Sequence, residues 1–309
     1  MRLMLRYKLV SAVFLVLSAV YLALTALTEP DKVALEKYHL TAAQAVALIL
    51  TIALPYVIIW FIALIGYLRF NSYAETIRGS RDGTAFMTMS QGLLMLALWL
   101  PVSAVSSILA AHYYRDHPSS TATLIIAINY VNIALLFPAF IQMYRGARKL
   151  LPLIKTTAAS LSQTVNLVFI CFSALYVFLV LEDPARHAAT DSTTIASYYL
   201  PDWLIIISLV IPRLIMWFFG AKAVQYLYLY RNRVKGTLYK AALNNLARGI
   251  AGVVLATIVL RCIQSLSSQL GELSLALMLL VIYLLLLLIA IGYVLIFKGA
   301  KNLQQIEEL

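Results

Sequence analysis

Eight long apolar stretches most constrain how this chain can fold. A helix needs about 20 mostly apolar residues to cross the ~30 Å hydrocarbon layer of a bilayer. The sequence has such stretches at residues 9–28, 46–68, 86–111, 121–144, 162–181, 203–229, 243–270 and 273–297. Their apolar residues are contiguous and do not alternate as in the strands of a membrane barrel. We therefore predict an all-α, polytopic membrane bundle of eight transmembrane helices.

The composition points to the lipid bilayer as the solvent and partner of this chain. Hydrophobic residues make up 62% of the sequence and charged residues only 12%, and the mean hydropathy is +0.88. A soluble domain with these values would expose far more apolar surface than water tolerates. Helices satisfy their own backbone hydrogen bonds, so a helical membrane protein accommodates this composition.

Three motifs occur twice in the same order, which indicates an internal duplication. The second copies are shifted by 155 (13 to 168), 157 (55 to 212) and 153 residues (144 to 297). The pairs are VFLVLSAVY and VFICFSALY at 13–21 and 168–176, PYVIIWF and PRLIMWF at 55–61 and 212–218, and YRGARKL and FKGAKNL at 144–150 and 297–303. Each copy holds four spans, an even number, so both enter the membrane from the same side. We predict one compact bundle of two parallel tandem repeats, residues 1–150 and 151–309.

The charges are distributed by side of the membrane. The chain has a net charge of +11, and sixteen of its 24 Lys and Arg residues fall in the N-terminal tail or after even-numbered spans. Nine of the 13 acidic residues fall in the opposite loops. This is the positive-inside pattern, which predicts a cell-membrane protein with both termini in the cytoplasm. Sidedness explains the basic charge, so we expect no nucleic-acid partner.

Four prolines fall inside the predicted spans and predict kinks there: Pro55, Pro101, Pro138 and Pro212. Proline removes one helical hydrogen bond, and the freed carbonyl needs another partner. Neighbouring helices or hydroxyl side chains can supply it, so we read these prolines first as shaping the packing.

Arg213 and Arg261 lie deep within spans of the second repeat. Arg213 follows Pro212 about ten residues into its span, which at ~1.5 Å per residue puts it roughly 15 Å deep. Arg261 lies nearer the outer end of its span, so we expect it to extend to the outer headgroups. The first repeat has Tyr56 and Ala104 at the corresponding positions. Arginine at a span centre costs about 2.5–3.5 kcal/mol on insertion scales, so Arg213 needs polar neighbours.

Polar residues elsewhere in the spans are candidate neighbours for Arg213. Asn129 and Asn132 are three apart and share a helix face, and Asn166 and the Tyr56 hydroxyl are further candidates. Two interpretations stay open. Either these groups hold Arg213 as part of the packing, or Arg213, Arg261 and these groups form a substrate pathway with an anion as the transient partner.

The sequence carries no catalytic or metal-binding signature. HExxH, GxSxG and GxxxxGK[ST] are all missing, so an enzymatic activity is unsupported. The four histidines fall in predicted outer loops without metal-ligand spacing, and we favour solvated loops over a metal site: His39, His112, His117 and His187. Because no histidine lies in a span, we expect no haem and no other cofactor.

A repeated [YF]-[RK]-G-A-[RK] motif places cations at the inner ends of the fourth and eighth spans. Arg145, Arg148, Lys298 and Lys301 belong to it. We expect these residues to contact anionic lipid headgroups on the cytoplasmic side and anchor the two helices.

Two function classes fit these features. A transport-type protein would pass a small anion or an amphipathic, lipid-like substrate between the two repeats, which would explain the duplication and Arg213 together. The alternative is a membrane scaffold or assembly subunit without transport or catalysis, which fits the short, chemically plain loops. A membrane-protein partner or a homo-oligomer is compatible with both.

Overall fold

The computed structural model of the chain is all-helical, and eight of its helices are long and apolar enough to cross a membrane. The structure describes residues 2–27, 41–116, 121–151, 160–182, 206–269 and 275–307. The elements are α1 (Arg2–Leu27), α3 (Ala42–Thr76), α4 (Arg81–Asp116), α5 (Thr121–Leu150), α6 (Ser160–Glu182), the π-helical turn η3 (Ile206–Val210), α9 (Ile211–Arg231), α10 (Thr237–Gln269) and α11 (Leu275–Glu307). The prediction of eight helices with the length and apolar composition needed to cross a membrane is confirmed.

Most of these helices are longer than their apolar stretches. At α3 the reason is visible, because a capping box starts the helix before the apolar run. The Gln44 amide donates to Thr41 Oγ1 at 3.3 Å, and the Thr41 amide donates to Gln44 Oε1 at 2.9 Å. These two bonds satisfy backbone N–H groups that have no partner within the helix, so α3 starts at Ala42 and not at residue 46.

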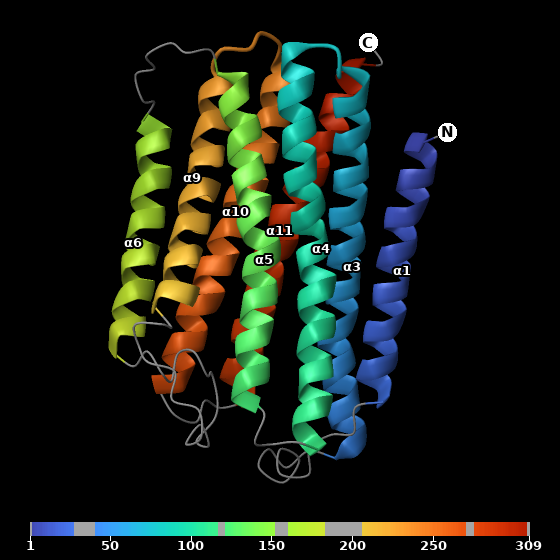
Figure 1. Cartoon of the computed structure of the whole chain (residues 1–309), viewed down its shortest axis with the longest axis vertical. Helices are drawn as coiled ribbons and strands as arrows, with labels where there is room; N and C mark the ends of the chain where they lie inside the picture. Colours follow the sequence, from blue (N-terminus) through green and yellow to red (C-terminus); the bar gives the residue numbers. More distant parts are fainter. Residues whose placement is uncertain are drawn as a thin grey trace.

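Six helices form a closed ring, and two lie outside it. Around the ring, α3 packs on α4, α4 on α5, α5 on α9, α9 on α10, α10 on α11, and α11 returns to α3. Outside it, α1 packs on α3 and α4, while α6 packs on α9 and α10, so these two occupy opposite edges of the bundle (Figure 1). We call the end that carries both chain termini the proximal end and the other the distal end (Figure 1).

Glycines bring the most tightly packed helix pairs together. A Cβ built on Gly92 of α4 would lie 2.6 Å from the Ala139 carbonyl oxygen of α5. A Cβ built on Gly249 of α10 would lie 2.6 Å from the Gly292 carbonyl oxygen of α11. Close backbone approach at small residues is the usual way that membrane helices associate, since lipid gives no hydrophobic drive between them.

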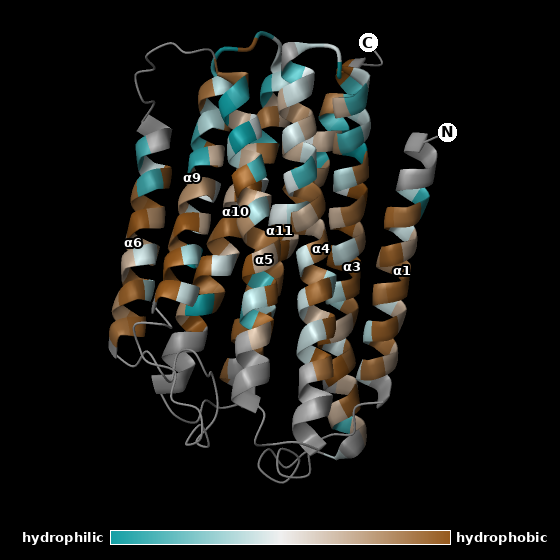
Figure 2. Cartoon of the chain, in the orientation of Figure 1, coloured by the Kyte–Doolittle hydropathy of each residue, from teal (hydrophilic) through white to brown (hydrophobic). Residues whose placement is uncertain are grey.

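The outer surface is apolar along the middle of the bundle. Figure 2 shows brown, hydrophobic ribbon over the centre of the helices and more teal, hydrophilic ribbon towards the proximal end. Large apolar side chains face outwards on both peripheral helices and on ring helices, for example Leu15, Ile58, Ile170 and Leu284. Such a surface fits a lipid environment and would not stay dispersed in water.

The four prolines do not occupy equivalent places. Pro55, Pro101 and Pro138 lie inside α3, α4 and α5, as predicted. Pro212 lies in the first turn of α9, directly after the π-helical turn η3. Proline is tolerated in a first turn because its missing N–H has no partner there. The irregularity at Pro212 is therefore a widened turn that precedes Arg213.

Candidate functional site: a cationic cavity beside a larger neutral cavity

Arg213 is buried and held by neutral groups on two other helices. Its exposed fraction is 3%. One guanidinium nitrogen, NH1, donates to the Tyr176 hydroxyl of α6 at 2.7 Å. The other, NH2, donates to Asn129 Oδ1 of α5 at 2.8 Å. Tyr176 and Asn129 solvate the guanidinium without neutralising it, so a positive charge remains inside the bundle.

The site lies nearer the distal than the proximal end. Tyr176 is six residues from the distal end of α6 at Glu182, and Asn129 is eight residues from the distal end of α5 at Thr121. At ~1.5 Å per residue these positions are roughly 9–12 Å from the helix ends. Arg213 therefore lies in the distal third of the bundle and not midway along it.

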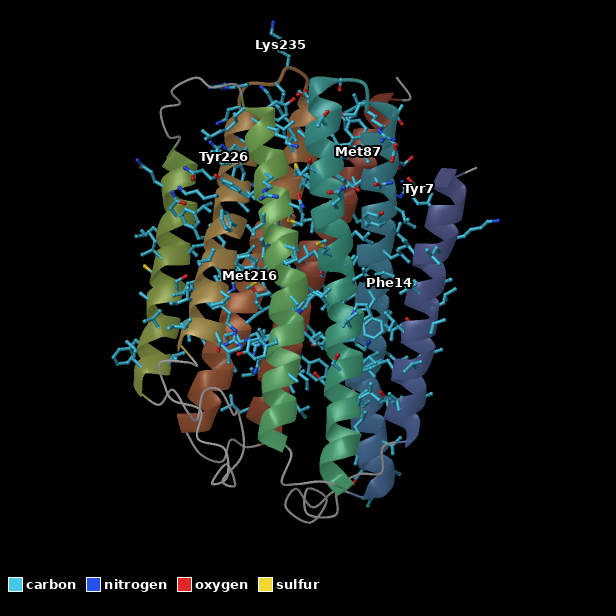
Figure 3. The ribbon with its side chains drawn as sticks, viewed as in Figure 1. Tyr7, Phe14, Met87, Met216, Tyr226 and Lys235 are labelled. Atoms are coloured by element: carbon cyan, nitrogen blue, oxygen red, sulfur yellow. The ribbon has the colours of Figure 1, made fainter. Side chains whose placement is uncertain are left out.

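A second arginine shares a small cavity with Arg213. This cavity has a volume of about 20 Å³ and lies among α4, α5, α9 and α10, enough for one water molecule. Arg261 of α10 lines it, and so does Met216, labelled in Figure 3. The expectation that Arg261 extends to the headgroups does not describe its position, since it faces the interior beside Arg213. We call this space the cationic cavity.

Two indole rings border the cationic cavity, and hydrogen bonds fix both. Trp99 Nε1 donates to Asn132 Oδ1 at 2.9 Å. Trp217 Nε1 donates to Thr257 Oγ1 at 3.1 Å. Asn132 therefore lines the same cavity as Arg213 but accepts its hydrogen bond from Trp99. Asn129, on the same helix face, accepts one from the Arg213 guanidinium.

A larger cavity lies on the other side of Trp99. Its volume is about 330 Å³, and its lining residues are Tyr21, Tyr56, Trp99, Leu100, Ser103, Ala104, Ser107, Ile108, Leu260 and Ile289. No charged side chain lines it. Trp99 and Leu260 line both cavities and so separate them. We call this space the neutral cavity. Its volume falls within the range of pockets that hold small organic ligands.

The predicted pathway residues thus divide into three groups. Arg213, Arg261 and Asn132 line the cationic cavity, and Asn129 binds Arg213 directly. Tyr56 lines the neutral cavity. Asn166 lies in the proximal half of α6, ten residues before Tyr176, and lines neither cavity.

Sequence reasoning missed Tyr176, Trp99 and Thr257. Tyr176 ends the repeated motif of 168–176, which could have marked it. The pairing of Trp99 with Asn132 has no comparable signal, because it depends on how α4 turns against α5.

The acidic residues of the described chain lie at helix ends. Asp82, in the first turn of α4, accepts a hydrogen bond from the Tyr230 hydroxyl at 2.6 Å. That hydroxyl lies 3.5 Å from the Tyr239 hydroxyl. This contact ties α4, α9 and α10 together at the proximal end, far along the helices from the two cavities.

The candidate headgroup contacts lie among the described residues, whereas most of the histidines do not. Arg145, Arg148, Lys298 and Lys301 are exposed on α5 and α11 near the proximal end, so their side chains are free to meet lipid. His39, His117 and His187 lie outside the described residues, and His112 is described only as part of α4. Within the described ranges, no three His, Cys, Asp or Glu residues cluster to hold a metal ion.

Comparisons with protein-family models, with curated proteins and with solved structures found no match to this chain. The function of the candidate site is therefore inferred from the geometry of the site alone.

Proposed function

We propose that this integral membrane protein is of the transport type and passes an anionic solute between two parallel tandem four-helix repeats. The cationic cavity supports this proposal most strongly. It holds two guanidinium groups in the apolar part of the bundle, and the direct partners of Arg213 are neutral. An arginine buried at this depth is expensive, and a transient anion would offset that cost.

The pattern of helix contacts supports the two repeats. In the first half, α4 packs on α1, α3 and α5; in the second, α10 packs on α6, α9 and α11. Two cross-contacts join the halves, α5 with α9 and α11 with α3. Each contact of one half therefore has a counterpart in the other, as expected when a four-helix unit is duplicated.

Individual residue contacts agree with this pattern. The rings of Tyr21 and Trp60 lie 5.0 Å apart, and those of Tyr176 and Trp217, the corresponding residues of the second repeat, lie 4.9 Å apart. The carbonyl facing Gly92 belongs to Ala139, and the one facing Gly249 belongs to the corresponding Gly292. The cationic cavity lies where helices of both halves meet, which is where a duplicated transporter places its substrate.

The distribution of charge supports a cytoplasmic proximal end in the cell membrane. Exposed cations of the described chain gather there, including Arg78, Arg145, Lys235 and Lys301. Lys235 extends from the proximal loop (Figure 3). Under the positive-inside rule, both termini face the cytoplasm, and the exposed cations meet its anionic lipids.

Flux measurements test transport directly. Purified protein would be reconstituted in liposomes, and uptake of inorganic phosphate and of a labelled anionic lipid would be measured for wild type, Arg213→Ala and Arg248→Ala. Arg248 is an exposed cation on α10, away from both cavities, and serves as the matched control. Arg213→Ala should lower flux about tenfold or more, because a hydrogen bond to a charged group contributes roughly 1.5–3 kcal/mol. Arg248→Ala should behave as wild type.

A charge-retaining variant separates lost function from lost folding. Arg213→Lys keeps a cation in the cavity and should retain part of the flux. If all three variants match wild type, Arg213 plays no role in transport. If wild type moves neither probe, the scaffold alternative replaces the transport proposal. Short proximal connections such as residues 77–80 favour that alternative, because they carry little structure of their own.

A further inference from the structure

We propose that the cationic and neutral cavities form one binding site for a small organic anion. This proposal rests on the proposed transport function and names the chemical class of the substrate. The charged group would bind between Arg213 and Arg261, and the uncharged part would occupy the neutral cavity beyond Trp99.

The two volumes favour an organic anion over an inorganic one. The cationic cavity, at about 20 Å³, has room for one water-sized group such as a single oxygen of a carboxylate or phosphate. The neutral cavity, at about 330 Å³, is large enough for a ring. An ion without an uncharged part would fill the first cavity and leave the second vacant.

The walls of the neutral cavity suit a polar, uncharged group. Ser103 and Ser107 lie one turn apart on α4 and line this cavity together with the tyrosine side chains of Tyr21 and Tyr56. Ser107 Oγ donates to the Ser103 carbonyl oxygen at 2.8 Å, and as a hydroxyl oxygen it can also accept a hydrogen bond. Hydroxyl groups both donate and accept, which suits a carbonyl, hydroxyl or ring-bearing ligand.

Trp99 lies between the two cavities. It lines both of them, and its only hydrogen bond from Nε1 goes to Asn132. The proposed site requires this bond to open, so that the ring turns and the two cavities join. A ligand that spans the site would then lie against the indole face, a stacking surface for a flat group.

Guanidinium chemistry fits the proposed charged group. Guanidinium N–H groups form charge-assisted hydrogen bonds with carboxylate and phosphate oxygens. Arg213 uses NH1 and NH2 for Tyr176 and Asn129, and it lines the cationic cavity together with Arg261. The substrate class is therefore a carboxylate or phosphate monoester with a ring-sized, uncharged part.

Binding of three phosphates to the purified full-length protein tests this proposal: inorganic phosphate, phenyl phosphate and a short-chain phosphatidic acid. Isothermal titration would report affinity, and quenching of tryptophan fluorescence would report binding near the cavities, which Trp99 and Trp217 line. Ala104→Phe fills the neutral cavity from its wall. Ala134→Phe adds the same ring at an exposed position of α5 and is the control.

Wild type and Ala134→Phe should bind phenyl phosphate about tenfold more tightly than inorganic phosphate, because the ring is buried. Ala104→Phe should remove this preference and leave inorganic phosphate binding within about twofold. Arg261→Gln should weaken both phosphates.

Two results would overturn the proposal while the transport function stands: equal affinity for both phosphates in wild type, or a preference that Ala104→Phe leaves unchanged. Tightest binding of phosphatidic acid, insensitive to Ala104→Phe, would assign the site to a lipid and overturn it as well. Absence of both binding and flux for every probe would remove the transport function too.

Discussion

Replacing Gly249 with alanine tests the packing on which the bundle depends. The added Cβ would lie 2.6 Å from the Gly292 carbonyl oxygen and 2.8 Å from the Ile296 amide nitrogen, so α10 and α11 must move apart. Overpacking of this kind costs about 1–3 kcal/mol. Alanine regains roughly 1 kcal/mol of helix propensity. We therefore expect a net loss of about 0–2 kcal/mol.

The corresponding substitution in the first half tests the duplication. Gly92→Ala places a Cβ 2.6 Å from the Ala139 carbonyl oxygen, the same distance as in the second half. Its next contact is Met143 Cγ at 2.9 Å, and a flexible methionine moves more easily than backbone. Gly92→Ala should therefore destabilise the protein by a similar or slightly smaller amount.

Gly66 supplies the control, because a Cβ there meets Phe297 Cα at 3.4 Å, an ordinary contact. Gly66→Ala should keep or raise stability by up to about 1 kcal/mol through helix propensity. Thermal unfolding in detergent, followed by tryptophan fluorescence, would rank the three variants. The packing argument is refuted if Gly249→Ala unfolds at a higher temperature than wild type or than Gly66→Ala. A neutral Gly92→Ala beside a damaging Gly249→Ala would count against two equivalent halves.

Three further substitutions address single contacts. Thr257→Val removes the acceptor of Trp217 Nε1 and should cost about 1–3 kcal/mol in thermal unfolding, since a buried donor loses its partner; unchanged stability would show that this bond contributes nothing. Asp82→Asn replaces the carboxylate that accepts a hydrogen bond from the Tyr230 hydroxyl and should speed amide hydrogen exchange across residues 232–236. Wild-type exchange rates there would argue that this bond does not hold α4 and α9 together at the proximal end. Thr41→Ala breaks the capping box of α3 and should cost about 0.5–2 kcal/mol, with faster exchange in its first turn; equal protection of that turn would contradict this role.

The helices follow from the sequence more fully than their ends do. Apolar runs of about 20 residues fix the number of spans, because a helix of that length satisfies its own backbone in lipid and barrel strands would alternate instead. They do not fix where a helix starts, since polar residues extend it into the interface. Thr41 and Gln44 have capping-box spacing in the sequence, yet the apolar pattern alone places the start of this span at residue 46.

The candidate site was less accessible to sequence reasoning, because it depends on which helices become neighbours. Asn129 could be proposed as a partner of Arg213 from its polarity within a span. Whether it reaches the guanidinium depends on contact between α5 and α9, which closes the ring between distant parts of the chain. The position of Arg261 depends on the rotation of α10 about its axis, and a count of residues from the end of a span does not determine this rotation.

The difference between the two cavities follows from the cost of charge in lipid, given the proposed duplication. Two identical repeats would place equivalent cavities in the ring, each with the same side chains. Two arginines in each would put four guanidinium groups in one bundle, each at an insertion cost of up to about 2.5–3.5 kcal/mol, which is the value for a span centre. The chain instead has Tyr56 and Ala104 where the second repeat has Arg213 and Arg261. Ala104 is also smaller than an arginine and lines the neutral cavity, so there is room for an uncharged group at the position that corresponds to Arg261 in the proposed duplication.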